Sequence, residues 1–385
     1  MNRTSFTGVV LLLFGLLCPV GVRSAAAEDA LATPVAKWHL LEPFWSSPIV
    51  YGESSLFVVD ADSHVATSNL LRPPKRVLKV ARADRSQTFE EGKDYRVETD
   101  GRLTAPAGSR IPVLKAGDFF PPKGAPRSIA ERAGDPNRAV LFDNVHWFHD
   151  HQVEITYEAA APWSGFQPAA GGGTLGKVLG KLARREPITI GVSGDSISFG
   201  LNASGVTGAA PHMPAYSQLL ADQLAATFSA KVTLVNRAVN GWGIGQGLDD
   251  LDKLLASRPD LVIVAYGMNH FGDRDPVGFR KGVATMLERI KAAQPEAEVL
   301  LVSPMWGNPD WSRTPEDQFQ PHRDVLASLV GPQIAMADLT TLWRDMRRRK
   351  SNADLTGNGV NHPNDFGNRV YAAALFGQLV GPAAK

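Results

Sequence analysis

Residues 188–197 read Ile-Thr-Ile-Gly-Val-Ser-Gly-Asp-Ser-Ile, and the rest of the chain is organised around them. Pro187 precedes strand-forming residues at alternate positions, so we expect a buried β-strand to begin here. Gly194 lets the backbone turn where the strand ends, and Asp195 can accept hydrogen bonds from nearby amides. Ser196 then lies at the carboxyl end of the strand, where open parallel sheets hold reactive groups. Taken alone, the segment also fits an ordinary strand, turn and helix with a capping serine.

From residue 187 onwards, predicted strands alternate with predicted helices. Apolar runs predict strands at 188–192, 232–235, 261–265, 299–302 and 334–336, and apolar residues at helical spacing predict helices at 215–228, 247–256, 277–293 and 366–380. This alternation predicts a parallel sheet covered by helices, with its reactive edge where the strands end.

Residues from about 37 to 162 show short β-like runs and little helical periodicity. The clearest runs are 55–59, 75–80, 95–98 and 152–157, and Thr-Asp-Gly-Arg at 99–102 is typical of a hairpin turn. We therefore predict a β-sandwich accessory domain at 28–164. An Ala/Gly run and a basic stretch at 165–186 predict a linker with at most one or two helical turns, which leads to a catalytic domain at 187–385.

Residues 1–27 have the pattern of a secretory signal peptide. Arg3 precedes a short apolar core at 9–20, and Ala25-Ala26-Ala27 fits a cleavage site. A retained anchor is the alternative, although the apolar run is short for a bilayer span. The only cysteine, Cys18, lies in this segment, so the mature chain would lack disulfides and thiolate ligands. The expected location is secreted or periplasmic, with no membrane span in the mature chain.

The charge balance argues against a nucleic-acid partner. The formal net charge is +1, whereas a nucleic-acid binder needs a basic face to neutralise phosphates. His146, His149 and His151 cluster beside Asp150 and raise the question of a metal site. Their spacing matches no recognised ligand pattern, which favours ordinary loop histidines.

Four polar or glycine-rich segments follow predicted strands or precede the last helix. They are Gly-Asp-Ser at 194–196, Asn-Arg-Ala-Val-Asn-Gly-Trp-Gly at 236–243, Gly-Met-Asn-His at 267–270 and Asn-Gly-Val-Asn-His-Pro-Asn-Asp at 358–365. In a parallel sheet the carboxyl ends of the strands share one edge, so we expect these segments to meet there.

On these four blocks, over roughly 187–380, the sequence resembles the SGNH hydrolases, also called the GDSL esterase family. The resemblance implies a flavodoxin-like, three-layer α/β/α sandwich. It also implies that Ser196 is the nucleophile, that His362 is the base, and that the backbone N–H of Gly241 and the side-chain amide of Asn269 line an oxyanion hole. It implies neither a cofactor nor a metal.

The chemistry accounts for these residue types. A serine hydroxyl is a weak nucleophile until an imidazole takes its proton. Attack on an ester carbonyl places negative charge on oxygen, which the N–H groups of Ser196 and Gly241 and the amide of Asn269 would stabilise.

The chain departs from the family pattern beside the base. The family usually has an aspartate three residues before the histidine, and here Gly359 stands at that position. Asn358 or a backbone carbonyl could orient His362 in a Ser–His dyad, and Asp354 is the nearby acid. Asp365 is expected to cap the last helix.

The predicted function is an exported serine esterase that forms an acyl-enzyme on Ser196. Its expected partner is a small-molecule or polysaccharide ester, with acetyl groups on carbohydrate favoured. The alternative is a carbohydrate-binding or surface-assembly protein whose hydrolase domain is degenerate or transfers acyl groups, which the missing aspartate favours. Five further residues are predicted only to lie near this edge of the sheet. His212 and His270 are expected as pocket or loop residues. Trp242, Trp306 and Trp311 are expected either to stack on sugars or to pack inside the protein.

Overall fold

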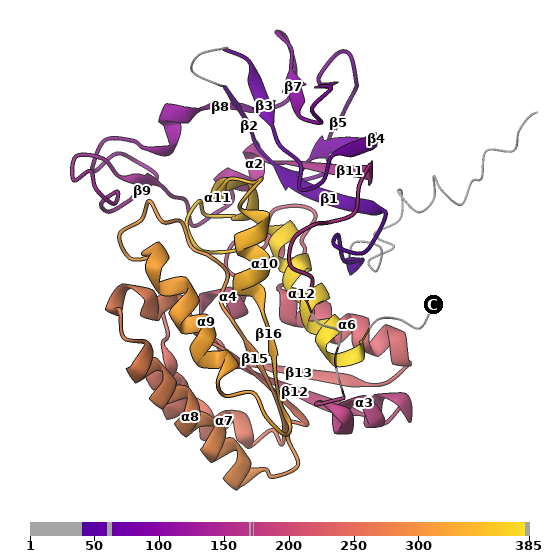
Figure 1. Cartoon of the computed structure of the whole chain (residues 1–385), viewed down its shortest axis with the longest axis vertical. Helices are drawn as coiled ribbons and strands as arrows, with labels where there is room; N and C mark the ends of the chain where they lie inside the picture. The colour runs from indigo at the N-terminus through magenta and orange to yellow at the C-terminus, as the bar shows by residue number, and fades with distance from the viewer. Residues whose placement is uncertain (1–40, 60–63, 169–170, 172, 382–385) are drawn as a thin grey trace, which may run out of the picture. The chain divides into compact units, whose positions relative to one another are not determined.

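The segment 188–197 forms strand β12 (Ile188–Gly194), followed directly by the short helix α4 (Ser196–Phe199). Figure 1 shows this computed structural model, which describes residues 41–59, 64–168, 171 and 173–381. The predicted signal peptide at 1–27 lies outside the described residues. In the ranges that the structure describes, no helix is long and apolar enough to cross a membrane.

β12 lies inside a five-stranded parallel sheet. The strand order is β13 (Val232–Asn236), β12, β14 (Leu261–Ala265), β15 (Glu298–Val302) and β16 (Ile334–Ala337), and all neighbours pair in parallel. In chain order this is 2-1-3-4-5, which is the flavodoxin-like order. The predicted parallel sheet is therefore confirmed, and each predicted strand corresponds to an observed one.

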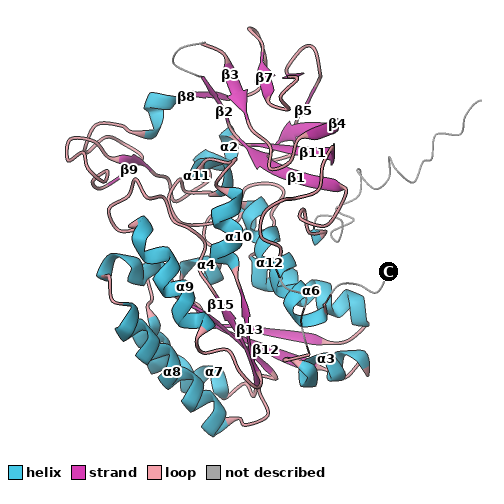
Figure 2. Ribbon diagram, viewed as in Figure 1, coloured by secondary structure: helices cyan, strands magenta, loops and turns pink. Residues whose placement is uncertain are grey.

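Helices cover both faces of this sheet (Figure 2). Leu261 and Ile263 pack in one core with α3 (Gly176–Ala183), α6 (Tyr216–Phe228) and α12 (Asp365–Val380), whereas the alternate residues Val262 and Val264 pack in a second core with α7 (Ile244–Leu255) and α8 (Pro276–Ala293). Successive strand residues point to opposite faces, so a strand buried on both faces must be apolar throughout. The three-layer α/β/α sandwich is confirmed.

The segment predicted as a linker contains a packed helix. In α3, Val178 and Leu182 are buried, and the carboxylate of the buried Glu298 accepts the first backbone N–H groups of the helix, from Lys177 at 2.9 Å and Val178 at 2.8 Å. A carboxylate suits this end of a helix because the free N–H groups there carry partial positive charge.

The amino-terminal part is β-rich, as predicted. One sheet has the order β1 (Ile49–Ser55), β11 (Val153–Ala159), β4 (Pro74–Arg82) and β5 (Thr88–Phe89), and a second has β6 (Arg96–Val97), β7 (Leu103–Ala105), β3 (Ala66–Ser68), β2 (Phe57–Val59) and β8 (Val113–Lys115). A two-stranded sheet joins β9 (Ser128–Ile129) and β10 (Val140–Leu141), and α2 (Trp147–His151) precedes β11. The predicted turn at 99–102 joins the antiparallel strands β6 and β7.

Buried polar contacts join the β-rich region to the segment that follows β16. This segment holds α10 (Leu339–Met346) and α11 (Asn352–Leu355). Nζ of Lys350 lies 3.0 Å from Oε1 of Glu53 in β1, and both side chains are fully buried. The amide of Gln152 donates to the carbonyls of Ala353 and Thr356 at 2.7 and 2.9 Å. Breaking such buried pairs is costly, so the two regions are held together by specific contacts.

Candidate active site

The predicted nucleophile begins helix α4. Ser196 is the first residue of this helix, and only 2% of it is exposed. Asp195 is the N-cap, and its Oδ1 accepts a hydrogen bond from the N–H of Ile197 at 3.0 Å. Burial raises the pKa of Asp195 to about 7. Because the N–H of Ser196 belongs to the first helical turn, it needs no partner within the helix and can donate to a substrate.

The predicted base lies in a tightly bonded turn before α12. Oδ1 of Asn358 accepts hydrogen bonds from the N–H groups of Val360, Asn361 and His362 at 2.9, 2.9 and 3.1 Å. Gly359 has a φ of +80°, and a Cβ there would lie 2.3 Å from the ring of Phe148, so glycine is required. These contacts fix the backbone that carries the imidazole.

The structure brings the nucleophile and the base into contact. Nε2 of His362 lies 2.9 Å from Oγ of Ser196, and Nδ1 lies 2.7 Å from Oδ1 of Asn202. Only 6% of His362 is exposed, and this burial lowers the pKa of the imidazole to about 4, because desolvation disfavours the charged form. A neutral imidazole beside a serine hydroxyl is the arrangement of a general base and its nucleophile.

The two predicted oxyanion-hole residues follow the strands on either side of β12. Gly241 follows β13 with a φ of +78°, and Asn269 lies in the 3-10 helix η3 (Met268–Asp273) after β14. Nδ2 of Asn269 donates to the carbonyl of Trp242 at 2.9 Å, so the two loops meet at the end of the sheet where Ser196 lies. An amide nitrogen has two hydrogens, and the second is available to a substrate oxygen.

His270, predicted as a pocket or loop residue, supports this loop. Its Nε2 lies 3.3 Å from the N–H of Ile244 at the start of α7, and burial lowers the pKa of the ring. Asn269 and His270 therefore contact two neighbouring points of the same loop. His212 lies exposed in a turn at φ +59°, and we assign it no role.

The two side chains considered as acceptors for the base, Asp354 and Asn358, have other partners, and Nδ1 of His362 contacts Asn202 instead. Asp354 caps α11 through Ser351 and accepts the N–H of Leu56 at 2.7 Å, and Asn358 binds the backbone of the turn.

The expectation that Asp365 caps the last helix is wrong. The N-cap of α12 is Asn364, which accepts from Gly367, while Asp365 accepts the N–H of Ser204 at 2.8 Å.

The three clustered histidines each contact another protein atom, and the three tryptophans predicted near the site are at least partly buried. His146 contacts Asp150, His149 the carbonyl of Ala210 and His151 the carbonyl of Trp147, each at 2.7 Å. Within the described part of the chain, no three His, Cys, Asp or Glu side chains gather as a metal site would require. Trp306 packs against Phe319 with ring centroids 5.0 Å apart, and Trp242 and Trp311 are partly buried.

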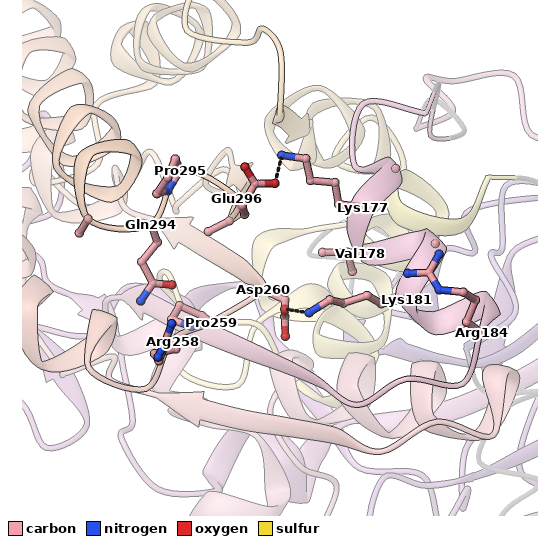
Figure 3. Close-up of a pocket in the computed structure, with 14 residues that line it drawn as sticks. Lys177, Val178, Lys181, Arg184, Arg258, Pro259, Asp260, Gln294, Pro295 and Glu296 are labelled. Carbon is pink, nitrogen blue, oxygen red and sulfur yellow. Dashed lines mark hydrogen bonds and ion pairs between the residues drawn. The ribbon is translucent and has the colours of Figure 1, made fainter.

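A wide cavity lies at the opposite end of the sheet from Ser196. Its volume is about 990 Å³, and it lies beside α3 and the residues just before β14 and β15 (Figure 3). Four of its charged side chains form two ion pairs, Lys177 with Glu296 and Lys181 with Asp260. Because it adjoins the amino ends of the strands, it is not the site of the predicted chemistry.

A second cavity, of about 410 Å³, lies between the β-rich region and the segment that leads to His362. Its lining includes Phe119, Phe120, Asp310 and Arg347, and it reaches Gly359 in the turn of the base. Aromatic and polar side chains therefore share this cavity.

Asn202 was not predicted as a site residue. It follows Ser196 by six positions, at the end of a turn after α4, and has a φ of +64°. Asparagine tolerates this backbone region better than most residues, which marks a turn. The contact with His362 spans 160 residues of sequence, so no local pattern indicates it.

Comparison with known proteins agrees with this geometry. Residues 192–370 match the model of the GDSL-like lipase/acylhydrolase family. No curated protein sequence matches the chain significantly.

Similar solved structures include a lipase from a goat rumen metagenome, with 15% identity and a TM-score of 0.41, covering 51% of this chain and 99% of that one. A two-domain esterase active on acetylated mannans has 21% identity and a TM-score of 0.43, covering 54% of this chain and 53% of that one. A lipase/acylhydrolase from Enterococcus faecalis has 20% identity and a TM-score of 0.39, covering 50% and 96%. On its family match, residues 192–370 of the chain are a domain of the GDSL-like lipase/acylhydrolase family.

Proposed function

We propose that this chain is an exported serine esterase that removes short acyl groups, chiefly acetyl, from carbohydrate esters. The observation that carries the proposal is the 2.9 Å contact between Oγ of Ser196 and Nε2 of His362, in a domain of this family. Export rests on the sequence of residues 1–27.

The first half of the reaction forms an acyl-enzyme. Nε2 of His362 takes the proton of Ser196 as Oγ attacks the ester carbonyl carbon. The carbonyl electron pair moves to oxygen, where the N–H groups of Ser196 and Gly241 and the amide of Asn269 stabilise the charge. The oxyanion then collapses, the bond to the alcohol oxygen breaks, and His362 gives its proton to the departing alcohol.

The second half repeats these steps with water. His362 takes a proton from water, the resulting hydroxide attacks the acyl carbon, and the same donors stabilise the oxyanion. Collapse breaks the bond to Oγ, and His362 returns its proton to Ser196. The products are a carboxylic acid and the free enzyme.

The lining of one cavity supports the carbohydrate part of the proposed substrate. The 410 Å³ cavity near the turn of His362 combines Phe119 and Phe120 with polar side chains, and the guanidinium of Arg132 covers one face of the Phe120 ring, 3.6 Å from its centroid. Ring faces and hydrogen-bonding groups together suit sugars, since a sugar presents both apolar faces and hydroxyls.

A comparison of chain lengths tests this proposal. The purified protein would be assayed on nitrophenyl acetate, nitrophenyl octanoate and an acetylated oligosaccharide, with release of nitrophenol or acetate as the readout. We expect hydrolysis of both acetyl esters and at least about tenfold lower kcat/KM for the octanoate, because excluding several methylenes costs more than 1 kcal/mol. Equal or faster cleavage of the octanoate, or no ester cleavage, would contradict the proposal.

A further inference from the structure

Asn202 is a buried amide whose orientation is fixed from outside the catalytic domain. Only 4% of it is exposed. Its Nδ2 donates to the carbonyl oxygens of Val145 and Asp143, at 3.1 and 3.4 Å, in the loop before α2. Carbonyl oxygens only accept, so they hold the nitrogen and turn Oδ1 toward Nδ1 of His362, 2.7 Å away.

This orientation determines where the imidazole carries its proton. An amide oxygen only accepts hydrogen bonds, so Nδ1 of His362 must be the donor to Asn202. In the neutral ring the lone pair then lies on Nε2, which faces the hydroxyl of Ser196. Asn202 therefore selects the tautomer that a general base needs, although it brings no negative charge.

The loop that holds Asn202 also braces the turn of the base. Oδ2 of Asp143 accepts the N–H groups of Val145 and Trp147 at 2.9 and 3.1 Å, which shapes the loop. The N–H of Asp143 donates to the carbonyl of Asn358 at 3.4 Å. One short segment of the β-rich region thus contacts both the partner of His362 and the turn that carries it.

We propose that Asn202 is the positioning residue of His362, in place of the family's aspartate, and that the loop 143–147 of the β-rich region completes the active site by holding it. The catalytic consequence rests on the proposed esterase function, whereas the control of the tautomer does not. On this proposal the β-rich region is part of the catalytic apparatus in addition to any binding role.

The test uses two substitutions at Asn202. Asn202→Gly removes the amide and keeps the positive φ, so it avoids the backbone strain that alanine would bring. We expect its kcat on nitrophenyl acetate to fall about 10²–10⁴-fold with little change in KM, as when a serine hydrolase loses the correct tautomer. Asn202→Asp places a negative charge beside the ring, and we expect it to raise the pKa of His362 by about 1–3.

A substitution in the loop tests the role of the β-rich region. Asp143→Ala leaves Asn202 in place and removes the acceptor that shapes the loop. We expect a loss of kcat on the order of tenfold, because small misplacement of a catalytic group is costly. The matched control is Gln152→Ala, which also deletes an amide that donates to two carbonyls between the regions but does not touch His362. This control should lower the unfolding temperature and leave the pH profile of kcat/KM unchanged.

The readout that separates this proposal from the esterase proposal is the titration of His362 by NMR on protein with isotope-labelled histidine. It needs no turnover, so it reports on Asn202 even if no ester is cleaved. An unchanged pKa of His362 in folded Asn202→Asp, or wild-type kcat in Asn202→Gly, would overturn the role of Asn202. Wild-type kcat in Asp143→Ala would overturn the role of the loop.

Discussion

Nε2 of His362 lies 2.9 Å from Oγ of Ser196, although 166 residues separate them in sequence. One residue follows β12, and the other precedes α12 in a turn held by Asn358. Ser196 lies at the carboxyl edge of the parallel sheet, and the turn before α12 carries His362 to the same place.

The acid limit of activity should lie well below the ordinary histidine range. Burial lowers the pKa of His362 to about 4, and the ring accepts a proton only when neutral. As the pH falls through this pKa the base becomes protonated, so kcat/KM should decline near pH 4 rather than near about 6.5. A kcat/KM profile checks this.

Acid unfolding must be excluded in the same experiment. A buried neutral histidine favours unfolding as the pH falls, because the unfolded chain binds the proton more readily. Circular dichroism at each pH provides that control. An acid limb near pH 6.5 in folded protein would show that the imidazole is not desolvated as described.

Asn269→Ala should impair the chemical step. Loss of one oxyanion donor costs about 10²–10³ in kcat, whereas KM should change little because the charge exists only in the transition state. Gly241→Ala is the comparison variant. The N–H of residue 241 remains, and nothing lies within 4 Å of the added Cβ. The only cost is the strain of an alanine backbone at a φ of +78°, about 1–2 kcal/mol. Equal kcat for wild type and Asn269→Ala would remove Asn269 from the oxyanion hole.

Asp354→Ala should affect stability rather than catalysis. The carboxylate caps α11 and accepts the N–H of Leu56, so its loss should cost about 1–3 kcal/mol in the free energy of unfolding. Urea denaturation measures that cost, and kcat should stay near wild type. A large fall in kcat with the fold intact would mean that Asp354 acts on His362 after all.

The regular parts of the fold were predictable because their residue patterns are local. The run at 261–265 is apolar at every position, and the observed strand has the same bounds. Helix α9 (Phe319–Ala327) was missed because Pro321 lies in its first turn, where proline is tolerated but removes the usual helical signal. α10 was missed because Thr340 and Thr341 follow its N-cap, Asp338, and weaken the helical propensity.

The candidate site was predictable only where family motifs reach. Ser196, His362, Gly241 and Asn269 each lie in a recognisable block. The partner of the base does not, because its acceptor comes from a turn after α4 and is held by carbonyls of the β-rich region. Every residue has a backbone carbonyl, so the sequence pattern does not indicate which carbonyls hold Asn202.

The most direct test of the central claim is covalent labelling of Ser196. Wild-type protein would be treated with a serine-reactive phosphonate and the modified residue identified by mass spectrometry, beside Ser196→Ala and His362→Ala. The account predicts one adduct on Ser196 in wild type, none at that position in Ser196→Ala and much slower labelling in His362→Ala. An unlabelled wild type that also cleaves no acyl ester, or equal labelling of wild type and His362→Ala, would contradict it.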